Sequence, residues 1–507
     1  MPAADSATEP DSRMYLGIDL GTSEVKVLLL DAGHHVVAVT GESLQISRPR
    51  PLWSEQHPHE WWAALDGAML RLAGQHGSAM ARVRAIGLSG QMHGAVLLDA
   101  LGEVLRPAIL WNDGRSGDAC AALESAVPEL RGITGNLAMP GFTAPKLYWL
   151  RENEPEIHAR TACVLLPKDW IRLRLTKERH TDYSDASGTL WLDVGARTWS
   201  DRMLSACGLS RAQMPSLVEG SAVAGRLHGA VARRWGLPED IPVAGGAGDN
   251  AASAIGIGAV MPGQGFVSLG TSGVIFVCAD RFLPNPDSAV HAFCHALPDR
   301  WHQMSVMLSA ASALRWATQL TGRESEASLL NAAEALSLSQ RTLAPLFLPY
   351  LAGERTPHND PNAKGVLFGL THEHGPGDVA HAVVEGVSYG LLDGFNSLDT
   401  ELRSSVRELS LVGGGARSSY WAQLLATLLQ RPLVLRVGAE TAAALGAARL
   451  AWLADGGEER EVCRTAPERS RFEPDPSPDS SLHARYERFT RLYPQVRPLW
   501  AERHSAT

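Results

Sequence analysis

The stretch YLGIDLGTSEVKVLLL, Tyr15–Leu30, determines the fold expected for the first part of the chain. It consists of an apolar run, a Leu-Gly-Thr-Ser turn and a second apolar run, a pattern typical of two strands joined by a tight hairpin. The same order returns in GFVSLGTSGVIFV, Gly265–Val277, about half a chain later. A chain that repeats such a unit at this distance is expected to contain two related domains.

Strands and helices alternate around both hairpins. Around the first we expect strands at Tyr15–Leu20, Val25–Leu30, Val36–Thr40 and Val83–Leu88, and a helix at His59–Leu72. Around the second we expect a strand at Val243–Gly246, a helix at Ala251–Gly258, and strands at Gly265–Leu269, Val274–Cys278, Leu409–Val412 and Leu433–Val437. The last expected segments are a long surface loop at Asp455–Ser481 and a helix at Leu482–Leu492. This alternation indicates the α/β class.

Composition excludes several kinds of protein. A chain of 507 residues with 45% hydrophobic and 20% charged residues is typical of a globular protein with two domains. The formal net charge of −9 argues against a nucleic-acid partner, and no apolar run is long enough to cross a membrane. The six cysteines show no CxxC spacing, which favours reduced thiols and a cytoplasmic location. Residues 1–13 are polar and are expected to form a disordered tail.

The repeated Gly-Thr-Ser turn can be interpreted as a binding site for an anion as well as a structural turn. Glycine lets backbone N–H groups approach an anion closely, and such concavities bind phosphate oxygens, with Thr and Ser adding hydroxyl donors. One copy alone is explained well enough by a tight hairpin. Two copies, the first preceded by Asp19, favour phosphate binding, although neither is a GxxxxGK[ST] loop.

Other polar residues leave two readings open. Asp249 follows an apolar strand and opens a helix, so it is either a general base or a helix cap. Asp113 and Arg115 could reach a ligand or form a buried pair. His291 and His295, with a cysteine beside them, have spacing that suggests a metal site, but buried strand histidines are the favoured account.

Several longer motifs resemble those of a known protein family. Asp19–Ser23 resembles the first phosphate loop of the actin-like ATPase superfamily, and Gly270–Ser272 resembles the second. Gly413–Arg417 resembles the adenosine-binding segment of the FGGY carbohydrate kinases within that superfamily. GFTAPKLYWLREN (Gly141–Asn153) and GVLFGLTHEHGPGDVAHAVVE (Gly365–Glu385) are similar to the two signature stretches of that family. The resemblance runs from Met14 to about Ala451.

The resemblance implies an architecture. It predicts two ribonuclease-H-like domains with an active-site cleft between them: 14–244 with the sugar site and the first phosphate loop, and 245–500 with the second loop, the adenosine site and the catalytic Asp. ATP and Mg²⁺ are the implied cofactors, and a small-molecule sugar is the implied partner. A homodimer is a further possibility within such a family.

Within the family, the most similar group is the one that phosphorylates D-xylulose. The stretches that carry this likeness are Pro51–Trp62, Gly90–Val96, Ile109–Ser116 and Leu348–Pro361. Members that act on glycerol usually have an Arg-Glu pair where this chain has Met92-His93. The expected reaction is therefore ATP-dependent formation of D-xylulose 5-phosphate. The alternatives are a kinase for another sugar or polyol (ribulose, gluconate or glycerol) and, from another class, an actin-like ATPase that is not a kinase.

The resemblance also implies a role for each matching residue. It makes Asp249 the general base and gives Asp19 the task of holding Mg²⁺, through water. It places Met92, His93 and Asn250 against the sugar. The residues implied for ATP are Gly21, Thr22, Ser23, Gly270, Thr271, Ser272, Gly414, Gly415 and Ala416. Glu24 departs from the small residue common after the first loop, and we expect its carboxylate to point into solvent.

Overall fold

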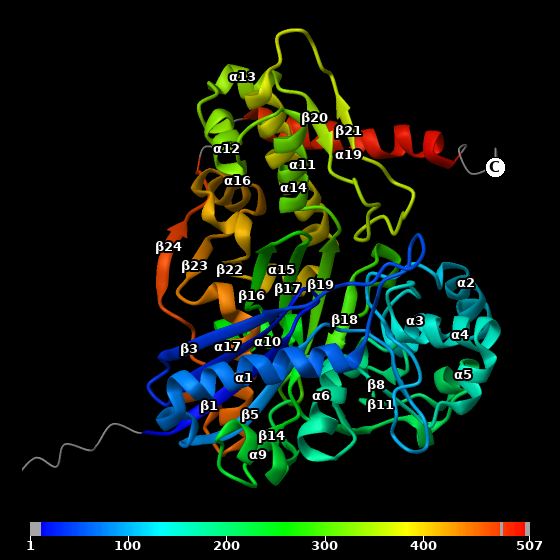
Figure 1. The fold of residues 1–507 in the computed structure, drawn as a ribbon. Coiled ribbons are helices and arrows are strands. Elements are labelled where there is room, and N and C mark those ends of the chain that lie inside the picture. The colour runs from blue at the N-terminus through cyan, green and yellow to red at the C-terminus, as the bar shows by residue number, and fades with distance from the viewer. Residues whose placement is uncertain (1–11, 477–479, 502–507) are drawn as a thin grey trace, which may run out of the picture. The chain divides into compact units, whose positions relative to one another are not determined.

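The computed structural model describes residues 12–476 and 480–501, which form two compact units (Figure 1). Unit 1 consists of the described part of Met1–Val260 together with Phe293–Trp301 and Thr441–Thr465, and unit 2 is the rest. The predicted domains, 14–244 and 245–500, divide the chain at one point and stay a prediction. The predicted tail, residues 1–13, lies outside the described residues except for its last two.

Unit 1 is built on a mixed sheet of seven strands. These are β1 (Met14–Leu20), β2 (Glu24–Asp31), β3 (Val36–Ser43), β5 (Val83–Gly90), β13 (Val223–Arg226), β14 (Pro242–Ala244) and β15 (Ala247–Gly248). Their order is β13-β14-β5-β1-β2-β3, and β15 pairs with β5 beyond β14. β1, β2 and β3 are antiparallel neighbours, as the hairpin motif predicts, whereas β5 runs parallel to β1 and to β14.

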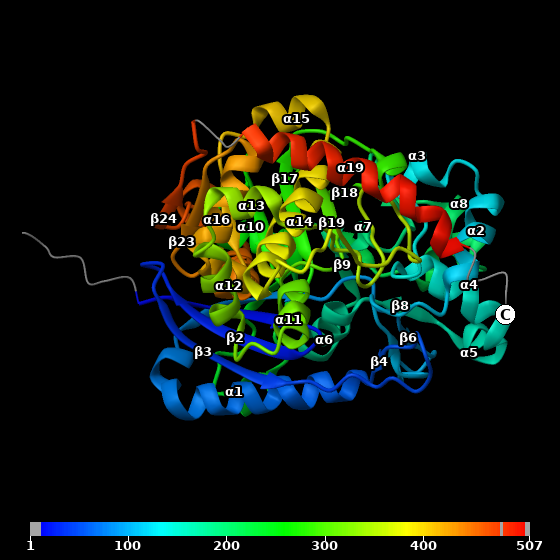
Figure 2. The same ribbon diagram turned by 90° about the horizontal axis from the view of Figure 1, so that it is seen from above.

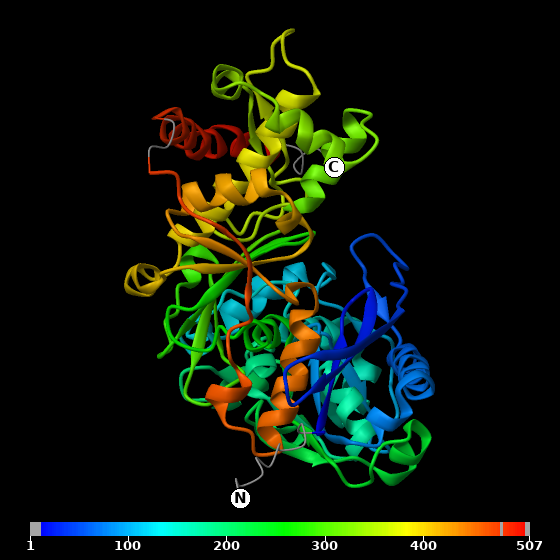
Figure 3. The ribbon, with the colours of Figure 1, turned by 90° about the vertical axis from the view of Figure 1, so that its left-hand side faces the viewer.

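The two faces of this sheet are covered by different helices. On one face Ile18, Val27 and Leu29 pack against α1 (Pro58–Met80), which runs along β2 and β3 (Figure 2). On the other face the alternate residues, Leu28 and Leu30 among them, pack with α10 (Asp249–Ile257) and α17 (Ala442–Ala454). Figure 3 shows α17, in orange, beside the blue strands. The period of two in the apolar runs thus produces a core on each face.

Two glycines let α17 approach the sheet closely. Gly17 of β1 and Gly87 of β5 are register partners. A Cβ atom would lie 2.0 Å from the Ala444 carbonyl oxygen if built on Gly17, and 1.8 Å from that of Ala447 if built on Gly87. The backbone of α17 therefore rests on bare strand backbone, a contact that no larger residue permits.

The remaining elements of unit 1 are short. Its other helices are α2 (Gly117–Ala126), α3 (Leu130–Thr134), α4 (Thr143–Asn153), α5 (Pro155–Arg160), α6 (Pro167–Thr176), α7 (Tyr183–Ser187), α8 (Asp201–Ala206), α9 (Gly229–Trp235) and α18 (Glu459–Val462). Four small two-stranded sheets are β4 (Glu55–Gln56) with β7 (Ala108–Ile109), β6 (Val96–Leu98) with β8 (Cys163–Leu165), β9 (His180–Asp182) with β12 (Ser216–Val218), and β10 (Leu192–Asp193) with β11 (Thr198–Trp199).

The main sheet of unit 2 repeats the strand order of unit 1. Its strands, in spatial order, are β18 (His291–Cys294), β19 (Trp301–Met307), β17 (Gly273–Ala279), β16 (Gly265–Leu269), β22 (Leu409–Val412), β23 (Leu433–Arg436) and β24 (Glu468–Phe472). The last two residues of β18 and the first of β19 are counted with unit 1. β16 is antiparallel to β17 and parallel to β22, as β1 is to β2 and β5. The second hairpin therefore starts a second copy of the same sheet.

Two expectations about the second half are wrong. The strand expected at Val243–Gly246 is β14, which joins the sheet of unit 1 by pairing with β5, so it does not open the second repeat. The segment Asp455–Ser481 is not one loop, because it contains α18 and an edge strand, β24, paired antiparallel with β23. Charged residues in β24 face solvent at the sheet edge, and this composition made the segment look like a loop.

Helices cover the unit 2 sheet around a long central helix, α14 (Pro376–Asn396). The others are α11 (Ala311–Leu320), α12 (Glu326–Glu334), α13 (Leu338–Leu343), α15 (Thr400–Ser405), α16 (Ser419–Leu429) and α19 (Ser480–Ala501). The expected last helix is confirmed by α19, which packs Phe489 against the small sheet of β20 (Leu346–Leu348) and β21 (Val366–Phe368). In the part of the chain that is described, no helix is long and apolar enough to cross a membrane.

The close approach of α17 generates a stability prediction. Gly87→Ala forces a methyl group onto the Ala447 carbonyl, and backbone of a packed helix must move to relieve the overlap. We expect the free energy of unfolding to fall by about 2 kcal/mol or more, measured by urea denaturation followed by circular dichroism.

Gly74→Ala is the matched control. Gly74 lies in α1 with no atom near its missing Cβ, so the change should be neutral or raise the free energy of unfolding by up to about 1 kcal/mol. Equal effects at the two positions would contradict the packing described for α17.

Candidate functional site

The candidate site in unit 1 is set by the register of β5 between β1 and β15. Ser89 pairs with Asp19 on one side and with Ala247 on the other, and Gly90 pairs with Leu20 and Gly248. All three strands are parallel here, so they end at the same edge of the sheet. The residues that follow or end them, Asp19 and Asp249 included, therefore emerge together, as polar groups do in ligand-binding α/β sheets.

Asp249 is the first residue of α10. Its Oδ1 accepts hydrogen bonds from the Asn250 N–H at 2.8 Å and from Asn250 Nδ2 at 3.0 Å. Burial, reinforced by the negative charge of Asp19, raises the pKa of Asp249 to about 7, and the Asn250 hydrogen bonds only partly oppose this. Gly248 is the N-cap residue of α10, so the Asp249 carboxylate does not act as the helix cap. A carboxylate that takes up protons near neutral pH suits a general base.

Asp19 is the second-last residue of β1, and its charge acts on Asp249. Its Oδ1 accepts a hydrogen bond of 2.9 Å from the Ser89 hydroxyl, and burial raises its pKa, partly offset by that bond and by the charge of Lys26. Lys26 lies opposite Asp19 in the β1–β2 register and pairs with Glu24 at 3.2 Å. The Glu24 side chain is 43% exposed, so the carboxylate faces solvent in part, as expected.

The hydroxyl of Thr22 in the first loop is occupied by protein. It donates to Gln91 Oε1 at 3.1 Å and accepts from Trp111 Nε1 at 2.9 Å. The loop is closed by a 3.0 Å hydrogen bond from the Gly21 N–H to the Glu24 carbonyl. The expected hydroxyl donor at Thr22 is thus used to fix the loop, and the backbone amides of the turn are the groups that suit an anion.

Two glutamines, which the sequence did not single out, extend this network. Gln56 Nε2 donates to the Thr22 carbonyl at 2.7 Å, and Gln91 Nε2 donates to Gln56 Oε1 at 3.1 Å. Gln91 also stands directly before Met92. Its position next to Met92 and His93 was the signal that could have identified Gln91 from the sequence. The side chain of Gln91 connects the first loop to the end of β5, after which these two residues follow.

His93 follows Gln91 and Met92 in an unusual backbone conformation. Its φ is +68°, in the left-handed region, and its ring Nδ1 is 2.6 Å from the Gly188 carbonyl oxygen. Because a carbonyl only accepts, Nδ1 carries the proton in this contact, so Nε2 is an acceptor whenever the ring is neutral. Phe142 lies edge-on to the ring at 4.8 Å between centroids, and Met92 packs against Gly248.

Lys146 holds the backbone of His93 in place. It is fully buried in α4 and donates to the His93 carbonyl at 2.9 Å and to the Gly141 carbonyl at 2.8 Å, while the Thr143 hydroxyl also donates to His93 at 3.1 Å. Burial lowers the pKa of Lys146 to about 7. The lysine belongs to the Gly141–Asn153 stretch, where sequence reasoning recognised the motif but assigned it no task.

For the other candidate residues, the structure favours a structural role over ligand or metal binding. Asp113 and Arg115 form a buried pair with 2.7 Å between Oδ2 and Nη2. His295 is buried, and burial lowers its pKa to about 3. In residues 12–476 and 480–501, no group of three or more His, Cys, Asp and Glu side chains is arranged to hold a metal ion.

The second loop and the predicted adenosine segment lie together in unit 2. The Thr271 carbonyl accepts from the Ala310 N–H at 3.0 Å and from the Ser312 hydroxyl at 2.7 Å, which anchors the loop. Gly413 has a φ of +91°, and a Cβ on it would lie 3.0 Å from the nitrogen of Gly270. A one-turn helix, η3 (Gly414–Arg417), follows, and a Cβ on Gly415 would lie 2.8 Å from the Cβ of Leu269, the residue before the second loop.

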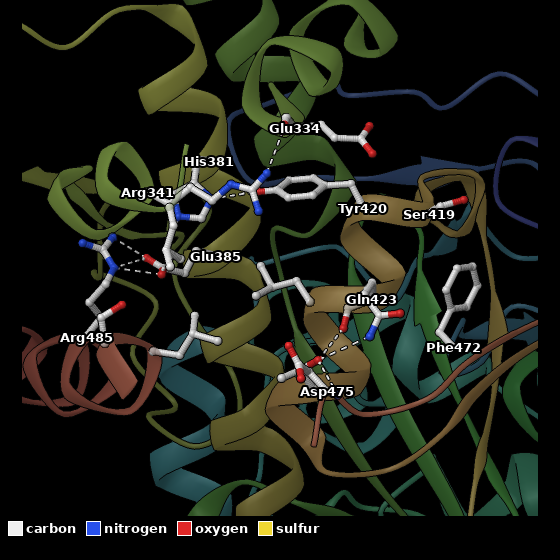
Figure 4. Close-up of a pocket in the computed structure, with 15 residues that line it drawn as sticks. Glu334, Arg341, His381, Glu385, Ser419, Tyr420, Gln423, Phe472, Asp475 and Arg485 are labelled. Atoms are coloured by element: carbon white, nitrogen blue, oxygen red, sulfur yellow. Dashed lines mark hydrogen bonds and ion pairs between the residues drawn. The ribbon is translucent and has the colours of Figure 1, made fainter. Parts of the chain in front are cut away.

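A cavity of about 470 Å³ in unit 2 adjoins the end of this segment (Figure 4). Ser419, the first residue of α16, lines it, and the Arg341 guanidinium lies over the ring of Tyr420 at 5.0 Å. The buried carboxylate of Glu385 pairs with Arg485, whose Nε is 2.9 Å from Oε1. The cavity contains none of the predicted catalytic residues, which lie in unit 1.

Proteins of known identity resemble this chain along nearly its whole length. The chain is 54% identical over 490 residues to the xylulose kinase of Escherichia coli (strain K12), covering 96% of this chain and 100% of that protein. A solved structure described as a "xyloylose kinase" from Brucella ovis has 48% identity and a TM-score of 0.91, covering 96% of this chain and 100% of that one. The xylulose kinase structure from Rhodospirillum rubrum has 28% identity and a TM-score of 0.87, with the same coverage.

Models of a protein family match both parts of the chain. The N-terminal domain of the FGGY family of carbohydrate kinases matches residues 14–256, and its C-terminal domain matches residues 265–454. The resemblance drawn from the two Gly-Thr-Ser loops is thereby confirmed, together with the two-domain α/β fold. The chain belongs to the FGGY family of carbohydrate kinases.

Proposed function

We propose that the protein transfers the γ-phosphoryl group of ATP to the C5 hydroxyl of D-xylulose, giving D-xylulose 5-phosphate and ADP. Membership of the family supports a kinase that acts on a small sugar, and the names of the relatives support D-xylulose. The observation that carries the proposal is the convergence of Met92 and His93 with Asp249 and Asn250 at one sheet edge in unit 1.

His93 and Met92 would meet the sugar from one side. The acceptor Nε2 of a neutral imidazole matches a sugar hydroxyl, and its proton position is set by the bond to Gly188. Met92, packed on Gly248, supplies an apolar wall one residue from the base. Asn250 offers a side-chain amide next to Asp249. Substrate held on these groups would present its terminal hydroxyl to the carboxylate.

Asp249 would take the proton from that hydroxyl as the new O–P bond forms. Phosphoryl transfer passes through a loose, highly charged transition state, so positioning and electrostatics carry most of the rate and the base completes the step. A pKa near 7 means that the base is available at neutral pH yet keeps enough affinity for a proton. On release of ADP the proton returns to solvent.

The phosphates of ATP are assigned to the two loops. In unit 1 these are Gly21, Thr22 and Ser23, acting through backbone N–H groups. In unit 2 the second loop and the adenosine segment contribute Gly270, Thr271, Ser272, Gly414, Gly415 and Ala416. The anchoring of Thr22 and Thr271 by neighbouring groups supports loops that are rigid before the nucleotide arrives.

Mg²⁺ fits the carboxylates of unit 1. Burial raises the pKa of both Asp19 and Asp249, so a positive charge near them would favour their ionised forms. Two carboxylates are too few for a site made of protein alone, but Mg²⁺ keeps several waters and takes phosphate oxygens. We propose that Asp19 holds the ion through water. When bound, it would neutralise phosphate charge.

The remaining expectations stay proposals. The net charge of −9 supports a protein without a nucleic-acid partner. A cytoplasmic location is in keeping with the lack of disulfides among the described cysteines. A homodimer stays a prediction.

A substrate panel tests the proposed reaction. We expect ADP release to show a kcat/KM for D-xylulose at least about tenfold above those for L-ribulose, gluconate and glycerol, because a site built to hydrogen-bond one sugar rejects others strongly. Preference for another member of the panel by that margin would assign a different substrate to the same site. ATP hydrolysis that no sugar stimulates would favour an actin-like ATPase instead.

Asp249→Asn tests the base. The variant keeps the size of the side chain but cannot accept a proton, so we expect turnover to fall about 10²–10⁴-fold, measured with saturating sugar and ATP. Asp201→Asn is the matched control, because Asp201 also opens a helix but pairs on the surface with Arg211. Near-normal turnover of a folded Asp249→Asn protein would exclude Asp249 as the base.

The thermal stability of the Asp249→Asn variant provides a second test. The folded-state pKa of Asp249 exceeds its ordinary value of 3.8, so stability falls as pH rises from about 4 to about 7 and the buried group ionises. Asn imitates the protonated acid at every pH. The variant should therefore unfold at a higher temperature than the wild type at pH 8, and the difference should shrink toward pH 4.

A further inference from the structure

A fully buried cluster of charges lies behind the candidate site in unit 1. Lys168 of α6 is 2.7 Å from Asp169, 2.8 Å from Asp182 and 2.9 Å from Asp185, and none of the four side chains is exposed. Arg172 adds a second cation, 2.9 Å from Asp169. Neither the sequence analysis nor the proposed reaction uses these residues.

The groups of the cluster shift one another's pKa values. Burial alone would lower the pKa of Lys168, but its three aspartates raise it, so the lysine is charged. Burial raises the pKa of Asp185 well above its usual range, although the charge of Lys168 opposes this shift. Two basic side chains, Lys168 and Arg172, thus lie among three aspartates in the interior of unit 1. Burying such a set costs several kcal/mol per ion, and apolar side chains of the same volume are often as stable. A gain in folding stability is therefore a weak explanation for the presence of this buried cluster.

The cluster connects to the site through the short helix α7. The Asp182 carboxylate caps this helix by accepting from the Ser184 N–H at 2.8 Å, and it also accepts the proton of the Ser184 hydroxyl. With its proton directed at Asp182, the Ser184 oxygen can only accept from elsewhere. It accepts from the N–H of Gly248 at 3.2 Å, and Gly248 is the residue before Asp249.

The other end of α7 contacts the sugar side of the site. Gly188, the residue that ends the helix, supplies the carbonyl that accepts from His93 Nδ1. The helix thus holds the residue before the base at one end and the candidate sugar histidine at the other. Its own position is set by the bonds of Lys168 to Asp182 and Asp185.

We propose that Lys168, Asp182 and Ser184 are positioning residues that hold Asp249 and His93 at a fixed spacing through α7. The inference rests on the proposed function, because it assumes that these two residues act on one substrate. Hydrogen bonds and ion pairs fix direction better than apolar contacts do, and a shift of about 1 Å in a reacting group can cost about 10²-fold in rate. This requirement explains why the chain keeps buried charges here.

Ser184→Ala isolates the link without leaving a charge unpaired. Asp182 keeps its ion pair with Lys168 and its bonds to the α7 backbone, but the Gly248 N–H loses its acceptor. We expect kcat to fall about tenfold or more, while the KM for ATP changes by less than about twofold. The comparison uses whichever sugar the wild-type protein phosphorylates best, so the identity of the substrate does not decide it.

Ser187→Ala is the matched control on the same helix. Its hydroxyl is equally buried, donates to the Tyr183 carbonyl at 2.8 Å and accepts from the Cys294 N–H at 3.0 Å, but does not contact Gly248. It should lose similar stability and keep its kcat. The proposal is overturned if Ser184→Ala keeps kcat within about twofold of wild type, or if both variants lose it equally.

Discussion

The register of β5 is the constraint on which the rest of the site depends. Because β1 and β15 run parallel to β5 on its two sides, Ser89 and Gly90 are flanked by Asp19–Leu20 and by Ala247–Gly248. A slip of one residue in either pairing would turn a carboxylate away from the edge. The close seat of α17 on Gly17 and Gly87 stabilises this register from one face of the sheet.

Much of the fold could be predicted because local patterns and tertiary structure agree. The apolar period around each Gly-Thr-Ser turn predicted the hairpins of β1–β2 and β16–β17, and the duplicated strand order follows from them. The sequence predicts roles for Asp249 and His93 because they stand in motifs beside strand ends, and these roles stay predictions. Edge strand β24 was missed because its residues are charged, which is the composition of a loop.

Other features could not be predicted because they join residues far apart in the chain. Nothing near α17 in sequence indicates that it packs on β1 and β5. The Tyr15–Asp455 hydrogen bond, with a sequence separation of 440, illustrates how far apart such partners are in the chain. Lys168 reads as an ordinary polar residue until the fold surrounds it with aspartates. Thr22 was predicted as a hydroxyl donor to phosphate, but the sequence does not show that the hydroxyl contacts Gln91 and Trp111. Their roles depend on the residues that contact them in the fold, and the sequence around each residue does not indicate those contacts.

The raised pKa of Asp249 is the most direct consequence of this arrangement. It is measured by carbon-13 NMR titration of protein labelled at the aspartate carboxyl carbons, with the Asp249 resonance identified by its loss in Asp249→Asn. The account predicts a midpoint near pH 7, with the acid protonated below it and ionised above it. A midpoint near the ordinary value of about 4 would contradict the account, because the carboxylate would then be neither buried nor close to the charge of Asp19.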